Sequence, residues 1–103
     1  MIIEMNIERT GKFLTNEPPC CLRMNPLNPH VVYFGTYTLI DGSNRKGSIE
    51  IWDVPNSQHL KTYDTHGAVL DIKLSPNFAT DLILVTGHST GNICVWKVNV
   101  NNY

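Results

Sequence analysis

Short apolar stretches alternate with polar turns along this chain. The stretches are rich in β-branched and aromatic residues, which favours extended strands over helices. No apolar spacing of 3.6 residues competes with the strand pattern, so we expect an all-β chain. In chain order, the predicted strands are Cys20–Met24, Val31–Tyr37, Ser48–Val54, Gln58–Tyr63, Ala68–Leu74, Leu82–Gly87 and Asn92–Val98.

Proline and glycine mark the ends of these stretches. Pro18 and Pro19 end an N-terminal segment of residues 1–17, which has no clear period and which we interpret as a tail or a partial strand. Ser75 and Pro76 are expected to end a strand, because proline cannot donate to a ladder of hydrogen bonds.

Two predicted strands are similar in sequence. Gly47–Val54 aligns with Gly91–Val98 without a gap, and Trp96 follows Trp52 by 44 residues. A period of about 40–45 residues with a Trp-Asp-like pair resembles a WD repeat, in which each period forms one four-stranded blade of a propeller. We interpret both tryptophans as packing residues between blades.

The spacing of the repeat predicts how the chain is divided. It favours a WD-repeat β-propeller fragment of about two blades, with the second blade lacking its last strand. Blade one is expected over residues 18–66 and the incomplete blade two over 67–103. In the complete ring, residues 1–17 would pair with the last blade. Blade one has extra residues near Thr38–Lys46, which predicts a loop that projects from one rim.

Composition excludes several classes of function. The formal net charge is −1, and the one adjacent basic pair, Arg45-Lys46, does not make the concentrated positive patch of a nucleic-acid-binding protein. No apolar run approaches the roughly 20 residues of a membrane helix. The N-terminus carries acids where a signal peptide has a basic region. We therefore expect a soluble, cytoplasmic protein that neither binds nucleic acid directly nor inserts into membranes.

The three cysteines lack the spacing of a disulfide framework or a zinc site. Cys20 and Cys21 are adjacent, and Cys94 is far away in the sequence. We interpret them as small buried apolar residues in a reducing compartment and predict no metal site. No phosphate-binding loop, dinucleotide motif or spaced carboxylate pair is present, so no cofactor is predicted.

The segment Gly87–Gly91 matches the G-x-S-x-G pattern of serine hydrolases. That motif requires a strand before the serine and a helix after it, but a predicted strand follows here. A turn between two strands explains the same residues.

His66, His88 and Ser89 are the candidate site residues. His66 lies in the link between the two blades and His88 in a turn between strands, and these two kinds of loop open on the same face of a propeller. Together with Ser89 they could supply a base and a nucleophile, or bind a polar ligand. The alternative is that all three are exposed loop residues without chemistry, because the sequence identifies no acidic partner that would orient a histidine.

Several segments together resemble a particular WD-repeat family, the diphthine methylesterases (also called diphthine methyltransferases) of diphthamide biosynthesis. The more specific segments are Pro18-Pro-Cys-Cys-Leu-Arg23 and His66-Gly-Ala-Val-Leu-Asp71. The resemblance extends from about Pro18 to Val98 and corresponds to the N-terminal portion of such a protein. The further segments are Gly35-Thr-Tyr37, Lys46-Gly-Ser-Ile49 and His88-Ser-Thr-Gly-Asn-Ile93.

This resemblance implies a cytoplasmic enzyme that hydrolyses the methyl ester of a modified histidine on elongation factor 2. The reaction releases methanol, needs no cofactor and frees a carboxylate for the enzyme that forms diphthamide by amidation. The family provides no assignment of catalytic residues that can be carried over, so the catalytic residues are unknown and His66, His88 and Ser89 are the candidates to test.

A second function stays open, namely a non-catalytic WD-repeat scaffold that binds protein partners. The absence of a complete catalytic constellation in the sequence favours it. In either case the strand edge at Ile93–Val98 is expected to be unpaired, so the chain alone should be insoluble, oligomeric or partly unfolded.

Overall fold

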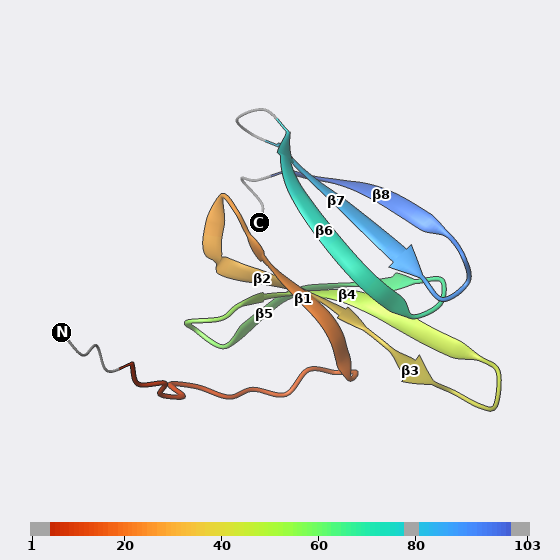
Figure 1. Cartoon of the computed structure of the whole chain (residues 1–103), viewed down its shortest axis with the longest axis horizontal. Helices are drawn as coiled ribbons and strands as arrows, with labels where there is room; N and C mark the ends of the chain where they lie inside the picture. Colours follow the sequence, from red (N-terminus) through yellow and green to blue (C-terminus); the bar gives the residue numbers. More distant parts are fainter. Residues whose placement is uncertain (1–4, 78–80, 100–103) are drawn as a thin grey trace.

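The computed structural model describes residues 5–77 and 81–99, in which every regular element is a strand (Figure 1). These strands form two antiparallel sheets, as the alternating pattern predicted. The strands are β1 (Pro19–Asn25), β2 (Asn28–Thr36), β3 (Thr38–Leu39), β4 (Arg45–Asp53), β5 (Gln58–Thr65), β6 (Val69–Asn77), β7 (Asp81–His88) and β8 (Ile93–Asn99).

The first sheet has the order β1-β2-β4-β5, and the short β3 extends it by pairing with the start of β4. The second sheet has the order β6-β7-β8. Thus the described part of the second sheet has no counterpart of β5. The all-β class and the arrangement of two units, the second lacking one strand, are confirmed.

The two sheets share an irregularity as well as an order. The register of β1 against β2 shifts between Pro19 and Cys21, and that of β6 against β7 shifts between Val69 and Asp71. These bulges lie at matching places in the first strand of each sheet. Since bulges are specific features of a fold, the match supports a structural repeat.

The larger of two apolar clusters in the described residues lies between the two sheets. The first sheet contributes side chains from β2 and β4, and the second contributes side chains from β6 and β7. Strand β6 is the one that approaches the first sheet most closely (Figure 1). The buried core residues are Val31, Tyr33, Ile49, Ile51, Val69, Ile72, Leu82 and Leu84.

The two tryptophans lie on corresponding faces of their sheets. Trp96 packs against the core between the sheets, where its ring lies 6.5 Å from that of Tyr63. Trp52 lies on the outer face of the first sheet, and the ring of Phe13 from the N-terminal segment stacks on it with a centroid distance of 4.5 Å. Trp96 therefore packs between the two units as predicted, whereas the N-terminal segment covers Trp52.

Other parts of the chain differ from the sequence-based expectation. Of the two interpretations of the N-terminal segment, a tail or a partial strand, residues 5–18 show no strand, and this segment lies against the first sheet through Phe13 and Glu17. Strand β6 does not end at Ser75 but continues to Asn77, and Pro76 pairs with Leu82. Proline is tolerated there because β6 is an edge strand of the described sheet.

The insertion near residues 38–46 forms a hairpin that projects from the first sheet (Figure 1). Its turn is closed by Asp41, whose Oδ1 accepts hydrogen bonds from the amides of Ser43 and Asn44. The side-chain amide of Asn44 donates to Oδ2, and these bonds lower the pKa of the Asp41 carboxyl. The sequence predicted the projection but not the short strand β3, because two residues carry no recognisable period.

Candidate functional site

The three candidate residues lie at one edge of the molecule, where the link between the sheets meets the β7–β8 turn. Ser89 N donates to Ala68 O at 3.0 Å, and Ala68 N donates to Ser89 Oγ at 2.9 Å. Thr90 Oγ1 donates to the carbonyl of His66 at 3.5 Å. The two loops are therefore in direct contact, which agrees with the expectation that they open on the same face.

Gly67 allows the two loops to approach each other closely. Its φ of 80° lies in the left-handed region, and a Cβ there would meet Thr90 Cγ2 at 2.7 Å and Ser89 Oγ at 2.9 Å. Only glycine meets both conditions without strain. The absence of a side chain at Gly67 thus lets the backbone of His66–Ala68 lie directly against Ser89 and Thr90.

His88 differs from the other two candidates because its side chain is only 5% exposed. Its Nε2 lies 2.7 Å from Thr86 Oγ1, and Trp96 Nε1 donates to the same hydroxyl at 3.0 Å. The hydroxyl has one proton and two lone pairs, so Thr86 Oγ1 can accept from Trp96 Nε1 and still either donate to or accept from His88 Nε2, the ring nitrogen opposite Nδ1. No hydrogen-bond partner for that buried Nδ1 is present among the described residues.

The sequence did not predict the burial of His88, although a signal was present. Leu82, Leu84, Thr86 and His88 alternate along β7, and all four are buried. His88 therefore continues the inward-facing row of the strand. The interpretation of His88 as an exposed loop residue is wrong, whereas His66 is exposed as that interpretation expects.

The three candidates lie near one another but are not connected as a dyad. In the described part of the chain, no hydrogen bond joins the side chains of His66, His88 and Ser89 to each other. The hydroxyl of Ser89 accepts a backbone bond and keeps its own proton for donation. The exposed imidazole of His66 can accept a hydrogen bond from a water molecule. This edge can thus supply a water-activating base, and Ser89 lies in the loop that contacts it.

A second polar cluster lies on the outer face of the first sheet, and the sequence analysis missed it. Glu50 is fully buried there, and its Oε1 accepts a hydrogen bond from Trp52 Nε1 at 3.2 Å. Its Oε2 is buried and has no partner among the described residues. The hydroxyls of Thr36 and Ser48 lie 2.7 Å apart on the same face. Strand alternation places Glu50 beside Trp52, on the face of the sheet that Phe13 of the N-terminal segment contacts.

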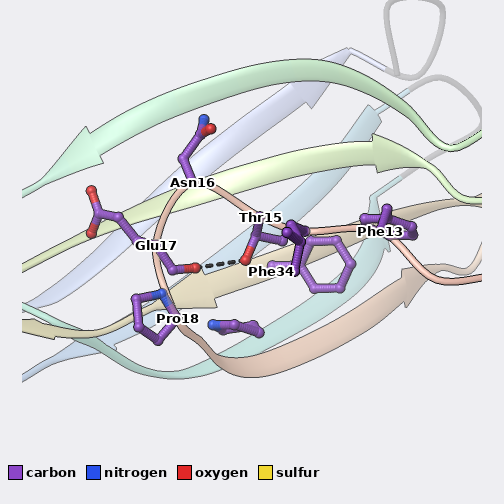
Figure 2. Close-up of a pocket in the computed structure, with 8 residues that line it drawn as sticks. Phe13, Thr15, Asn16, Glu17, Pro18 and Phe34 are labelled. Atoms are coloured by element: carbon purple, nitrogen blue, oxygen red, sulfur yellow. Dashed lines mark hydrogen bonds between the residues drawn. The ribbon is translucent and has the colours of Figure 1, made fainter.

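A pocket of about 540 Å³ lies beside this cluster, between the N-terminal segment and the first sheet (Figure 2). Thr15 Oγ1 donates to the carbonyl of Glu17 at 2.6 Å and shapes the turn that lines it. Figure 2 shows the carboxylate of Glu17 directed away from the rings of Phe13 and Phe34. That carboxylate instead accepts a hydrogen bond from Thr38 Oγ1 at 3.0 Å, which fastens the segment to the sheet.

The cysteines are free, and they differ in exposure. Cys20 is exposed, so the expectation that all three are buried is wrong for this residue. Cys21 is partly buried with its Sγ 3.9 Å from Val69 O, and burial raises the pKa of its thiol. In residues 5–77 and 81–99 no group of three or more histidine, cysteine or acidic side chains could hold a metal ion.

Within the same ranges there is no helix long and apolar enough to cross a membrane.

A comparison with curated proteins finds similarity to the diphthine methyltransferase of Saccharomyces cerevisiae (strain ATCC 204508 / S288c). The two sequences are 39% identical over 85 residues, which make up 82% of this chain and 21% of the relative. The resemblance inferred from the residues is therefore confirmed, and the chain spans about a fifth of that relative's length. No family model matches the chain. No solved structure matches it significantly either.

Proposed function

We propose that this chain is part of a protein that acts on diphthine and hydrolyses its methyl ester on elongation factor 2, with release of methanol. The observation that carries the proposal is the 39% identity to diphthine methyltransferase over 82% of this chain. The reaction would free the carboxylate that an amidating enzyme requires. The proposal includes a cytoplasmic location, since elongation factor 2 would be the substrate.

The edge around His66 and Ser89 is the part of this chain that we propose for the chemistry. His66 would act as a general base that activates the attacking water. Histidine is the side chain that most often serves as a general base, and His66 is exposed to water. His88 would have a structural role, because its buried imidazole, which precedes Ser89 in the chain, is hydrogen-bonded to Thr86.

The proposal also covers the organisation of the chain. Residues 18–66 and 67–103 would be successive repeat units, with residues 1–17 as a separate N-terminal segment. The matching bulges of β1 and β6 support this division, and so does the change of sheet between Thr65 and Val69.

The test uses elongation factor 2 that carries the methyl ester as substrate, for the chain itself and for the longer protein that contains it. Mass spectrometry should show conversion of the ester to the acid. His66→Gln should lower the rate constant about 10²–10⁴-fold, as expected for loss of a general base. The matched control is His30→Gln, another exposed histidine, which should leave the rate unchanged. An ester that persists with the longer protein would contradict the proposal.

The second candidate function is a scaffold that binds protein partners without catalysis. It is favoured by one observation, that the hydroxyl of Ser89 and the imidazole of His88 are each engaged in structural hydrogen bonds. It predicts that replacing His66 and Ser89 leaves turnover by the longer protein unchanged, while partner binding persists.

A further inference from the structure

The hairpin of residues 38–46 lies at the same end of the molecule as the candidate edge. Strand β4 begins at this end, and its Gly47 pairs with Thr65, the last residue of β5, so the link to the second sheet starts beside the base of the hairpin (Figure 1). A Cβ at Gly47 would lie 2.9 Å from Gly67 O, so the base of the hairpin is in direct contact with the link. The hairpin therefore lies next to the segment that carries His66.

The two sides of the hairpin differ, and one of them faces the candidate edge. Ile49 belongs to the core between the sheets, and alternation along β4 places Arg45 on the same side. Leu39 pairs with Arg45 across the hairpin and therefore shares that side. Lys46 lies on the opposite side, where its Nζ is 3.8 Å from Glu17 Oε1. Arg45 and Leu39 thus lie on the side of the second sheet, and Lys46 does not.

Arg45 is held in place on this side by Tyr37. Its Nε donates a hydrogen bond to the Tyr37 hydroxyl, and its guanidinium lies over the tyrosine ring, 5.9 Å from the centroid. Among the described residues, no hydrogen-bond partner of either Nη and no carboxylate in salt-bridge contact with Arg45 is present. The exposed guanidinium therefore presents free N–H groups in the fork geometry that binds a carboxylate in a bidentate manner.

The other charged groups of the hairpin are already engaged within the chain. The Asp41 carboxylate accepts three hydrogen bonds in the turn, and Lys46 pairs with Glu17. Arg45 is therefore the charged group of the hairpin that remains for a ligand. Leu39 beside it is 55% exposed. A free guanidinium next to an exposed leucine fits an acidic side chain that is accompanied by an apolar one.

This surface does not depend on how many sheets follow or precede the two described here. A neighbouring sheet packs on the faces of the strands, whereas the hairpin extends beyond Pro19 at the start of β1 and Thr65 at the end of β5. The turn of the second sheet at the same end is short, since it comprises only residues 89–92 between β7 and β8. The side of the hairpin above that turn is therefore open to a ligand.

We propose that Arg45 binds an acidic side chain of the protein substrate, elongation factor 2, and docks this substrate at the candidate edge. Tyr37 is a positioning residue that holds the guanidinium, and Leu39 supplies apolar contact beside the acid. The inference rests on the proposed function, because it takes the substrate from it. Arg45 binds the substrate protein and takes no part in the cleavage of the ester.

The test uses the longer protein that contains this chain and elongation factor 2 that carries the methyl ester. Calorimetric titration gives the dissociation constant, and the rate of ester hydrolysis gives kcat and KM. Arg45→Gln should raise the dissociation constant and KM about tenfold through the loss of a charge-assisted hydrogen bond. It should leave kcat unchanged, because a contact far from the ester is equally strong in the ground state and in the transition state.

Two further substitutions at Arg45 and one control separate charge from geometry. Arg45→Lys keeps the charge but not the fork, so it should raise the dissociation constant by an intermediate factor. Arg45→Glu reverses the charge and should weaken binding more than Arg45→Gln does. The matched control is Lys46→Gln, which removes the neighbouring cation on the opposite side of the hairpin and should leave binding unchanged. Equal effects of Arg45→Gln and Lys46→Gln would overturn the proposal.

The dependence of binding on salt is a readout that a purely structural role of Arg45 would not change. Salt should weaken binding of the wild-type protein, and the dissociation constant of Arg45→Gln should depend less on ionic strength because one ion pair is missing. Tyr37→Phe removes the acceptor for Arg45 Nε and should raise the dissociation constant about threefold. Identical salt dependence of wild type and Arg45→Gln would contradict the docking role.

The docking role and the proposed function fail in different ways. If the wild-type protein hydrolyses the ester and Arg45→Gln has an unchanged dissociation constant and KM, the docking role is wrong and the proposed function stands. If binding depends on Arg45 but the ester persists, the proposed function is wrong and the docking role stands. A wild-type protein that does not bind elongation factor 2 at all would overturn the docking role.

Discussion

Trp96 and Thr86 are joined by a hydrogen bond from the indole Nε1 to the threonine Oγ1 at 3.0 Å, across the β7–β8 pair. The corresponding indole of Trp52 donates instead to Glu50 on its own strand. The two repeat units thus satisfy equivalent indoles with different acceptors. In the second unit the bond continues to His88, so that a candidate site residue is linked to the packing between the sheets.

Thr86→Val should destabilise the protein through this network. The substitution keeps the shape of the side chain but leaves the Trp96 N–H and His88 Nε2 without their partner. We expect a loss of about 1–3 kcal/mol in the free energy of unfolding, measured by urea denaturation. Thr10→Val, at an exposed position of the N-terminal segment, is the control and should change the free energy by less than about 0.5 kcal/mol.

Ser89→Ala should loosen the contact between the two loops of the candidate site. The substitution removes the hydrogen-bond acceptor for the Ala68 amide, which we expect to lower the free energy of unfolding by about 1 kcal/mol. Hydrogen exchange of the Ala68 amide should become faster. Ser43→Ala, in the exposed turn of the β3–β4 hairpin, should not affect that amide. Unchanged exchange in Ser89→Ala would show that the hydroxyl does not hold the loop.

Gly47→Ala should weaken the junction of the two sheets. A Cβ at this position would lie 2.6 Å from Thr36 O and 2.8 Å from Ala68 Cα, and backbone atoms cannot move aside cheaply. We expect a loss of about 1–3 kcal/mol, as for an overpacked core. Gly42→Ala is the matched control, since nothing lies within 4 Å of its added methyl group. Equal melting temperatures for the two variants would contradict this prediction.

Tyr33 should make the stability depend on alkaline pH. Burial raises the pKa of its phenol from 10.0 to about 12. As the pH rises, the unfolded chain therefore releases this proton before the folded chain does. The contribution of Tyr33 to the free energy of unfolding is complete below pH 10 and is lost as the pH rises towards 12. The loss amounts to about 2–3 kcal/mol at most. Tyr33→Phe should lack this part of the decline, which denaturation at several pH values would reveal by difference.

Much of the fold could be predicted from the sequence because it depends on local pattern. The alternation around Trp52 and Trp96 identified equivalent strands, and seven of the strands lie within a few residues of the predicted ranges. The path of β6 through Pro76 could not be predicted, because the tolerance for proline depends on the absence of a neighbour on one side.

The site was predictable only in part. The contact between the loops of His66 and Ser89 follows from the repeat, which places both loops on one edge. The burial of Glu50 could not be predicted, because strand alternation gives only the face on which it lies, and how that face is covered depends on tertiary structure. His88 was predictable in part. Alternation along β7 indicates that it faces inward, but its hydrogen bond with Thr86 depends on the rotamers of both side chains, which the sequence does not give.

The close approach at Gly47 has a consequence for larger assemblies of such sheets. Because β6 is held near the first sheet while β7 and β8 lie farther from it, the two sheets form a wedge rather than a parallel stack. Repeating one wedge angle from sheet to sheet bends the stack into an arc. The absence of a side chain at Gly47 therefore helps to set the angle between neighbouring sheets, and this angle determines how many sheets complete a circle.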